Sequence, residues 1–408
     1  MIKIHNFPAS FGDTFLVCIN EDGSKEVNIL IDCGREFSSN AQKTLEKMGE
    51  NKSHKIDRFI ITHFDDDHIA GLYKFLQQNG SAENPNIIEI QQIWLNTFRH
   101  LQFFKRESTP IGSEEIERLE LFKLSFPDLK PMGTEQEIGA KQAMLAGRLI
   151  YTNGYSWNAD FAGEACTAFR SIQISENVRL HILTPTVENL KNIEAEFIRK
   201  LKSDFGLVPT NEDFFDDAFE LYVKNGSLER KKEKSVSSVH REISLYNMPN
   251  IIKNADYYPD TASGNGSSVS FILETSTKRM LFLADAHAED VIASLKEMFP
   301  DKQQPLIFDA IKVAHHGSFR NNKPELFTVI DSEKFIFSTN GKHQSHVHPD
   351  IETIAHIITR TRPEKVIKRT LYFNHDFVEK QEHLKAFQKD ELRNFYNYEV
   401  SMVREIEV

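Results

Sequence analysis

The chain has 408 residues, of which 40% are hydrophobic and 27% charged, and its 49 basic and 60 acidic side chains give a net charge of −11. This composition excludes disordered, collagen-like and coiled-coil proteins, and at roughly 150 residues per domain the length allows two or three domains or one domain with insertions. The acidic balance argues against a protein that coats nucleic acid over its whole surface, but it leaves a local groove open.

The first 95 residues predict a strand-rich unit. Short β-branched runs separated by turn residues predict strands over 1–7, 14–20, 27–32, 55–63 and 89–95. The strand over 55–63 ends in a nearly continuous apolar run, which is typical of a strand covered on both faces. Leu72, Phe75 and Leu76 have helical spacing, and we expect this helix to stop at Gly80.

The middle of the chain follows a different pattern. Helices are predicted over 113–126, 186–203 and 211–226, and a single strand over 178–185. A polar, basic segment at 227–242 reads as an exposed surface. We therefore expect 96–177 to be an insertion, 178–185 to be a core strand, and 186–262 to be a helical insertion.

Residues 263–408 return to regular alternation. Strands are predicted over 267–275, 279–285, 308–315, 334–339 and 365–372, and helices over 288–299, 350–361 and 383–392. Strands at both ends of the chain, interleaved with helices, indicate stacked sheets covered by helices. The class is thus α/β, with the two ends of the chain forming one domain.

Cysteine usage and hydropathy suggest the compartment. Cys18, Cys33 and Cys166 have no metal-ligand spacing, and any disulfide scheme leaves one unpaired, which fits a reducing environment. The N-terminus does not read as a secretory signal, and no run of about 18 apolar residues occurs. We expect a cytoplasmic protein that does not enter a membrane.

Histidines gather in two windows of the sequence. Seven of the 16 histidines lie in 63–68 and 315–348, which together make 40 residues. The first window reads THFDDDH directly after an apolar strand, so a loop at the strand end can bring its side chains to one point. Adjacent carboxylates repel one another unless a cation is present, and imidazole with carboxylate is a ligand set for Zn²⁺ or Mn²⁺. Metal binding explains this pattern better than a solvated acidic turn.

These motifs resemble the metallo-β-lactamase superfamily. THFDDDH has the H-x-D-x-D-H form found in the nuclease domain of ComEC-type competence proteins, and further similar segments follow in the expected order: FGDTFLV, ILIDCG, GNGSSVSFILE with RMLFLADA, IKVAHHGS and FSTNGKHQSHVHPD. The resemblance covers 1–95 and 263–375 but not the insertions between them. It implies a four-layer αββα sandwich with a metal site at one edge.

The resemblance also implies roles for individual residues. One divalent ion would be bound by His63 and Asp65, a second by Asp67 and His68, with Asp285 bridging them and a histidine of the His315–His316 pair completing the shell. The ions would be Zn²⁺ or Mn²⁺, and a hydroxide bridging them would be the nucleophile. Asp67, His316 and His348 are the predicted catalytic residues, with His348 as the proton donor to the leaving oxygen.

Several neighbours of the site admit two interpretations. Asp13 and Asp32 either orient the metal-binding loop or simply form turns, and Asp66 is expected to support the site or to face solvent. On an extended strand His315 and His316 would point in opposite directions, so only one is expected to bind a given metal. Ser318 is a candidate for holding a phosphate oxygen. We expect His181 and His356 to be structural, and His343 and His346 to lie in an exposed loop.

The predicted function is a metal-dependent phosphodiesterase, most simply a nuclease acting on DNA or RNA. Its basic groups would come from the last third of the chain: Lys312, Arg320, Lys323, Lys342, Lys368 and Arg369. One alternative is a hydrolase of a lactone, thioester or cyclic nucleotide, for which aromatic residues such as Tyr151, Tyr155 and Trp157 could line a pocket or stack bases. The second alternative is a binding domain without activity. The insertions offer a surface for a protein partner.

Overall fold

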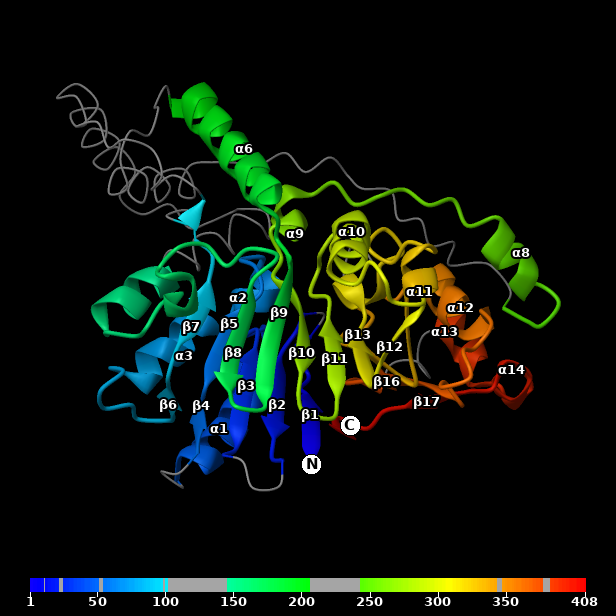
Figure 1. The fold of residues 1–408 in the computed structure, drawn as a ribbon, viewed down its shortest axis with the longest axis horizontal. Coiled ribbons are helices and arrows are strands. Elements are labelled where there is room, and N and C mark those ends of the chain that lie inside the picture. Colours follow the sequence, from blue (N-terminus) through cyan, green and yellow to red (C-terminus); the bar gives the residue numbers. More distant parts are fainter. Residues whose placement is uncertain are drawn as a thin grey trace.

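A computed structural model describes residues 1–10, 12–21, 25–50, 54–97, 100–101, 145–205, 243–342, 347–376 and 382–408. Two mixed sheets make up its core (Figure 1). The helices predicted over 113–126 and 211–226 and the basic segment at 227–242 lie outside the described residues, as do His343 and His346.

The first sheet comes almost wholly from the N-terminal part of the chain. Its six strands are β18 (Glu405–Glu407), β1 (Ile2–Asn6), β2 (Phe15–Ile19), β3 (Val27–Ile31), β5 (Arg58–Ile61) and β7 (Ile93–Leu95), in that spatial order. The strands from β18 to β3 pair antiparallel, whereas β3, β5 and β7 pair parallel. The last strand of the chain therefore joins the first, and both termini lie at the lower edge in Figure 1.

The second sheet has eight strands. In spatial order they are β17 (Tyr398–Ser401), β16 (Arg369–Phe373), β15 (Lys334–Phe337), β13 (Ala310–Lys312), β11 (Arg279–Phe282), β10 (Ser270–Glu274), β9 (Val178–Thr184) and β8 (Ser171–Ser175). The strands from β11 to β17 are parallel, and those from β8 to β11 antiparallel. Strand β8 falls in the range that we assigned to an insertion, yet it extends the sheet through a hairpin with β9. Two short parallel pairs complete the strands: β4 (Lys55–Ile56) with β6 (Glu89–Ile90), and β12 (Leu306–Phe308) with β14 (Ile330–Ser332).

The sheets pack face to face through apolar side chains from both, such as Phe15 and Ile31 from one sheet and Phe271 and Phe282 from the other.

The helices and 3₁₀ turns of the described residues, in chain order, are η1 (Phe37–Ser39), α1 (Ala41–Glu50), α2 (Asp66–Ile69), α3 (Leu72–Asn79), η4 (Ala159–Phe161), α6 (Val187–Phe205), α8 (Met248–Lys253), α9 (Ser263–Gly266), α10 (Ala288–Met298), η5 (Ala314–Gly317), α11 (Leu326–Val329), α12 (Ile351–Thr359), α13 (Glu382–Lys385), η6 (Ala386–Gln388) and α14 (Asp390–Tyr396).

Helical layers cover the outer faces of both sheets. The first sheet packs through Leu30, Phe59 and Ile61 against the layer of α1 and α3, and the second sheet packs against α10, α11 and α12 (Figure 1). The four-layer αββα sandwich predicted from the sequence is thereby confirmed. Helix α1 was not predicted, whereas α3 ends before Gly80 as expected, where the backbone turns left-handed at φ 76°.

The parallel strands determine where functional side chains gather. Strands β3 and β5 are parallel neighbours in one sheet, as are β11 and β13 in the other, so each pair directs its carboxyl ends to one edge. In the part of the chain that the structure describes, no helix has the length and apolar character needed to cross a membrane.

Candidate metal centre

The predicted metal ligands lie in three loops at the carboxyl ends of buried strands. His63 follows β5, and Asp65, Asp67 and His68 lie at or in the short helix α2. Asp285 follows β11, and the His315–His316 pair lies in η5 just after β13. The structure thus brings together residues more than 200 positions apart in the sequence.

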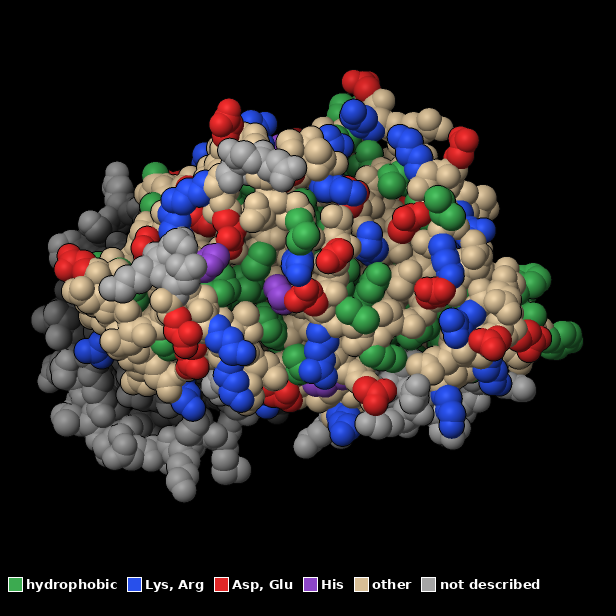
Figure 2. Space-filling view, turned by 90° about the horizontal axis from the view of Figure 1, so that it is seen from below, with side chains coloured by type: hydrophobic (Ala, Val, Ile, Leu, Met, Phe, Trp, Pro, Cys, Tyr) green, Lys and Arg blue, Asp and Glu red, His purple; other side chains and the backbone are tan. Residues whose placement is uncertain are grey.

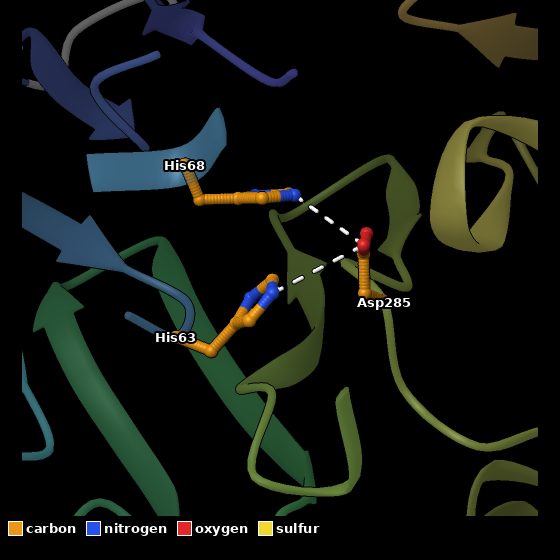
Figure 3. Close-up of side chains that lie close together, drawn as sticks. All are labelled: His63, His68 and Asp285. Atoms are coloured by element: carbon orange, nitrogen blue, oxygen red, sulfur yellow. Dashed lines mark ion pairs between the residues drawn. The ribbon is translucent and has the colours of Figure 1, made fainter. Parts of the chain in front are cut away.

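The centre of this cluster is one oxygen of Asp285. Its Oδ2 lies 3.4 Å from His68 Nε2 and 4.0 Å from His63 Nε2, and Figure 3 shows both rings directed at the carboxylate. The same oxygen is 3.5 Å from His315 Nε2 and 3.8 Å from His316 Nε2. Four imidazoles, two from each half of the chain, therefore point the same nitrogen at one carboxylate oxygen.

The second nitrogen of each imidazole is held by another group. His63 Nδ1 lies 3.1 Å from Thr62 Oγ1, and His68 Nδ1 lies 2.8 Å from Asp32 Oδ2. His315 Nδ1 lies 2.8 Å from Asn321 Oδ1, and His316 Nδ1 lies 2.8 Å from the backbone oxygen of Ser338. Such partners fix the tautomer and the orientation of a metal-binding histidine. With Nδ1 occupied in this way, Nε2 is the atom available to a ligand.

Three atoms at the centre are buried without a hydrogen-bond partner among the described residues: His63 Nε2, His68 Nε2 and Asp285 Oδ1. Buried polar atoms are almost always satisfied in folded proteins, so this group calls for a species that accepts several lone pairs at once. A divalent cation is such a species, and a nitrogen and oxygen donor set suits Zn²⁺ or Mn²⁺. The residues present fit a metal.

The ligand atoms fall into overlapping triplets whose members lie within 4.8 Å of one another. These are His63–His68–Asp285, Asp67–His68–His316 and Asp285–His315–His316. Asp65 lies at the margin, with its Oδ2 3.9 Å from His63 Nε2. Asp285, His68 and His316 each belong to more than one triplet, so the ligand atoms form one continuous cluster.

Electrostatics show that the cluster needs positive charge. Burial alone would raise the pKa of Asp285, but His315, His68 and His316 hold it well below its usual range. Burial would likewise lower the pKa values of His68 and His316, yet the surrounding carboxylates raise the first well above its usual range and the second to about 9. The carboxylates and imidazoles of the cluster therefore stabilise one another's charged forms.

The backbone explains how both histidines of the pair reach Asp285. Strand β13 ends at Lys312, and His315 and His316 then adopt left-handed conformations with φ 43° and 54°. The condition under which the two rings would point in opposite directions is therefore not met, because neither residue is extended. Gly317 follows with φ 96°, and a Cβ there would lie 2.5 Å from Pro349 Cβ, so only glycine fits this turn. Left-handed non-glycine residues are costly and concentrate at functional sites.

Asp32 orients the metal-binding loop. It accepts hydrogen bonds from His68 Nδ1 and from Thr62, through the backbone N–H at 2.7 Å and through the hydroxyl. Because the Thr62 hydroxyl donates to Asp32, its oxygen accepts from His63 Nδ1. One carboxylate thus fixes both histidines of the first window, and of the two interpretations left open by the sequence the structure supports orientation.

Asp13 and Lys312 form a second support beneath the cluster. Their side chains are ion-paired and almost fully buried, and Lys312 Nζ also donates to Ala284 O at 3.1 Å and lies 3.8 Å from Asp285 Oδ1. Asp13 Oδ1 lies 3.3 Å from His316 Nδ1. Sequence reasoning placed Lys312 among cations for nucleic acid, which is wrong: it is 2% exposed.

Three of the other cations proposed for nucleic acid are paired with acidic side chains. Arg369 is buried and bonded to Asp331, Lys323 pairs with Glu289 and Glu325, and Lys368 pairs with Glu399. On the face shown in Figure 2, opposite the metal centre, basic and acidic side chains alternate. This mixture on the opposite face agrees with the net charge of the chain.

The remaining predicted residues lie around the cluster. Asp66 is buried and ion-paired with Arg35, so solvent exposure was the wrong alternative for it. His348 lies beside His315, with 5.4 Å between ring centroids, and its Nδ1 is 3.7 Å from Asp350. Ser318 is buried in the turn after His316.

Two histidines are structural, as expected. His181 bonds Glu274 at 2.9 Å on the outer part of the second sheet, and His356 stacks on Phe319. Asn321 was not predicted from the sequence. It holds His315 and donates to Asp260 and to the carbonyl of Asp285, and only its position after HHGS could have suggested this role.

Comparisons with known proteins add distant structural likenesses. No protein-family model matches the chain, and no curated protein does. The metallo-β-lactamase fold protein YhfI from Bacillus subtilis aligns at 9% identity with a TM-score of 0.35, and the Zn²⁺-bound PqqB from Methylobacterium extorquens aligns at 9% identity with a TM-score of 0.36. Each alignment covers 100% of both chains. Similarity this low does not bear on what the chain does, which depends on its own side chains.

Proposed function

We propose that the chain is a metal-dependent phosphodiesterase. The observation that supports it is the convergence of four Nε2 atoms on Asp285 Oδ2, with every Nδ1 already held by another group. A structural cluster of histidines needs no such common orientation. A site that holds two cations side by side does.

The ligands divide between two ions. His63 and Asp65 would hold the first ion, Asp67 and His68 would hold the second, and Asp285 would lie between them. His315 and His316 flank Asp285 from the other sheet, and His316 Nε2 also contacts Asp67 at 3.1 Å. Bound divalent ions supply Lewis acidity and stabilise the negative charge that develops on phosphate oxygens.

The chain's own residues supply orientation and proton transfer. Asp32, Asp13 and Lys312 hold the ligands rigidly, so the centre does not reorganise when substrate binds. His348 stands outside the group around Asp285 but next to His315, and we assign it the delivery of a proton to the leaving oxygen. Asp67 and His316 form the bonded pair on the other side of the centre and keep each other oriented.

Nucleic acid is the proposed substrate, as either DNA or RNA. The competing candidate is a small ester, lactone, thioester or cyclic nucleotide, and the buried or paired state of Lys312, Lys323, Lys368 and Arg369 favours it. For an ester, lactone or thioester, the same metal centre would polarise the carbonyl group of the substrate. A chain that only binds its ligand is the third candidate.

Activity assays with defined metals separate these candidates. Protein loaded with Mn²⁺ or Zn²⁺ is offered single- and double-stranded DNA, RNA, bis(p-nitrophenyl) phosphate and a set of thioesters and lactones. The proposal predicts metal-dependent hydrolysis of phosphodiesters. Turnover of carbonyl esters alone would replace it with the second candidate, and metal binding without any turnover would replace it with the third.

A further inference from the structure

Helix α6 packs beside α9 and is anchored to both halves of the sandwich. Leu190 and Ile193 are buried in the apolar layer outside the first sheet, and Asn189 Nδ2 donates to Asp290 Oδ2 of α10 at 2.9 Å. In Figure 1 the helix rises above the sheets from a base next to α9. A helix from the region predicted as an insertion is therefore held next to α9, the helix whose Asn265 approaches His315.

A cavity of about 460 Å³ lies between α6, α9 and the start of α10. It is lined by Asn189, Asn192, Ala195, Arg199, Thr261, Ser263, Gly266 and His287. Ser263 and Gly266 flank Asn265, whose amide nitrogen lies 3.4 Å from His315 Nδ1, and His287 is two residues from Asp285. The cavity thus begins where the metal centre ends.

The chemistry of the lining suits an anion. The lining residues include the exposed Arg199, the amide of Asn192 and two hydroxyl groups but no carboxylate, and the nearby carboxylate of Asp290 accepts a hydrogen bond from Asn189. A second cavity of about 540 Å³, bordered by Arg58 and β6, includes Glu83 and Glu89. Amide, hydroxyl and guanidinium donors are the groups that recognise phosphate oxygens.

The floor of the cavity depends on a close approach between α9 and His287. A Cβ at Gly266 would lie 2.8 Å from His287 Cε1, and His287 Nε2 bonds the carbonyl of Ala262 at 3.0 Å. Because residue 266 is glycine, the imidazole ring of His287 can pack against α9 and close the floor of the cavity. The Nδ1 atom of His287 lies 3.7 Å from Asp290 Oδ2. The volume falls within the range of pockets that hold a group the size of one nucleotide.

We propose that this α6–α9 cleft binds the phosphate next to the scissile one, with Arg199 as its charged contact. The inference rests on the proposed phosphodiesterase function and specifies its substrate as a nucleotide chain that carries a second phosphate. A metal centre next to this cleft would hydrolyse nucleotide chains that carry a second phosphate with a lower KM than isolated phosphodiesters.

The test compares substrates that differ by one phosphate. Metal-loaded protein is assayed with the dinucleoside monophosphate TpT and with its 5′- and 3′-phosphorylated forms. The wild type is expected to show a KM about tenfold lower for one phosphorylated form than for TpT. Arg199→Ala removes this preference while kcat and the KM for TpT stay unchanged, and Arg199→Lys retains part of it.

Lys191→Ala is the matched control, because Lys191 is exposed on the same helix but does not line the cleft. It should keep the wild-type preference. Absence of any preference in the wild type, or its persistence in Arg199→Ala, would overturn the inference.

A binding measurement separates this inference from the function on which it rests. If no phosphodiester is hydrolysed, the affinity of the fluorescently labelled phosphorylated dinucleotides is measured in an Asp285→Asn background with and without Arg199→Ala. Weaker binding without the arginine supports the cleft although the proposed function fails. Equal binding refutes the cleft.

Discussion

The two halves of the chain build their shares of the metal centre in different ways. The N-terminal half contributes His63, Asp65, Asp67 and His68 from six consecutive residues around a short helix, and Asp32 alone orients both histidines. The C-terminal half contributes Asp285 and the His315–His316 pair from two separate loops. Those loops depend on left-handed backbone and on the buried Lys312.

This difference shows where each half is vulnerable. The N-terminal ligands depend on one hydrogen-bonding carboxylate, whereas the C-terminal ligands depend on a buried ion pair and on strained turns. Loss of Lys312, which supports the C-terminal ligands, should therefore affect folding and activity together, and loss of Asp32, which orients the N-terminal histidines, should mainly affect metal affinity.

The largest effect is expected for Asp285→Asn. Both halves lose the carboxylate that they share, so kcat for phosphodiester hydrolysis should fall by about 10³-fold or more. Asp309→Asn is the control, since that carboxylate pairs with Lys278 on the surface. Activity within tenfold of the wild type would show that Asp285 is not at the reacting centre.

Lys312→Met tests the support of the C-terminal half. It leaves the buried Asp13 without its cation, and the free energy of unfolding of the metal-free protein should fall by about 3–5 kcal/mol. Chemical denaturation measures this loss, and the double variant with Asp13→Asn should recover part of it. Lys278→Met removes a surface partner and should cost less than about 1 kcal/mol. Equal losses in the two lysine variants would contradict a special role for Lys312.

Asp32→Asn tests the support of the N-terminal half. Asparagine keeps the shape but weakens the hold on His68 Nδ1, so metal affinity should fall by about 10- to 100-fold. Competition against a chelator reports the affinity, and circular dichroism should show an unchanged fold. If Asp32→Asn unfolds the protein, or leaves its metal affinity unchanged, the proposed difference between the supports of the N-terminal and C-terminal ligands would be contradicted.

The smallest effect is expected for Asp66→Asn. Asp66 pairs with Arg35 and takes no part in the cluster, so metal content should not change and stability should fall by about 1 kcal/mol or less. Asp67→Asn, one residue further on, should lose metal. Loss of metal in both variants would mean that the helix α2 presents a different face to the centre.

The sequence motifs and the family they resemble predicted the sandwich, which the structure confirms, and the residues that the structure brings together at the candidate site. The THFDDDH motif and the histidine pair stood out because histidines and carboxylates gather directly after apolar strands, whereas Asp285 was found only through the resemblance. The orientation of His315 and His316 could not be predicted, because nothing in the residue types requires two adjacent non-glycine residues to be left-handed.

Lys312 and two secondary-structure elements were missed for physical reasons. A lysine normally lies at the surface, and only the opposing carboxylate of Asp13 makes its burial possible. Helix α1 places Ala41, Leu45 and Met48 at helical spacing, and β8 alternates Ile172 and Ile174 with polar residues, but each pattern has too few apolar positions to stand out.

Metal stoichiometry tests the central claim most directly. Wild-type protein and Asp285→Asn are saturated with Mn²⁺ or Zn²⁺, freed of excess ion by gel filtration, and assayed for metal by mass spectrometry. The geometry predicts two ions per wild-type chain and fewer than one in the variant. A wild type that keeps less than one ion, or an Asp285→Asn variant that keeps two, would contradict a centre organised around Asp285.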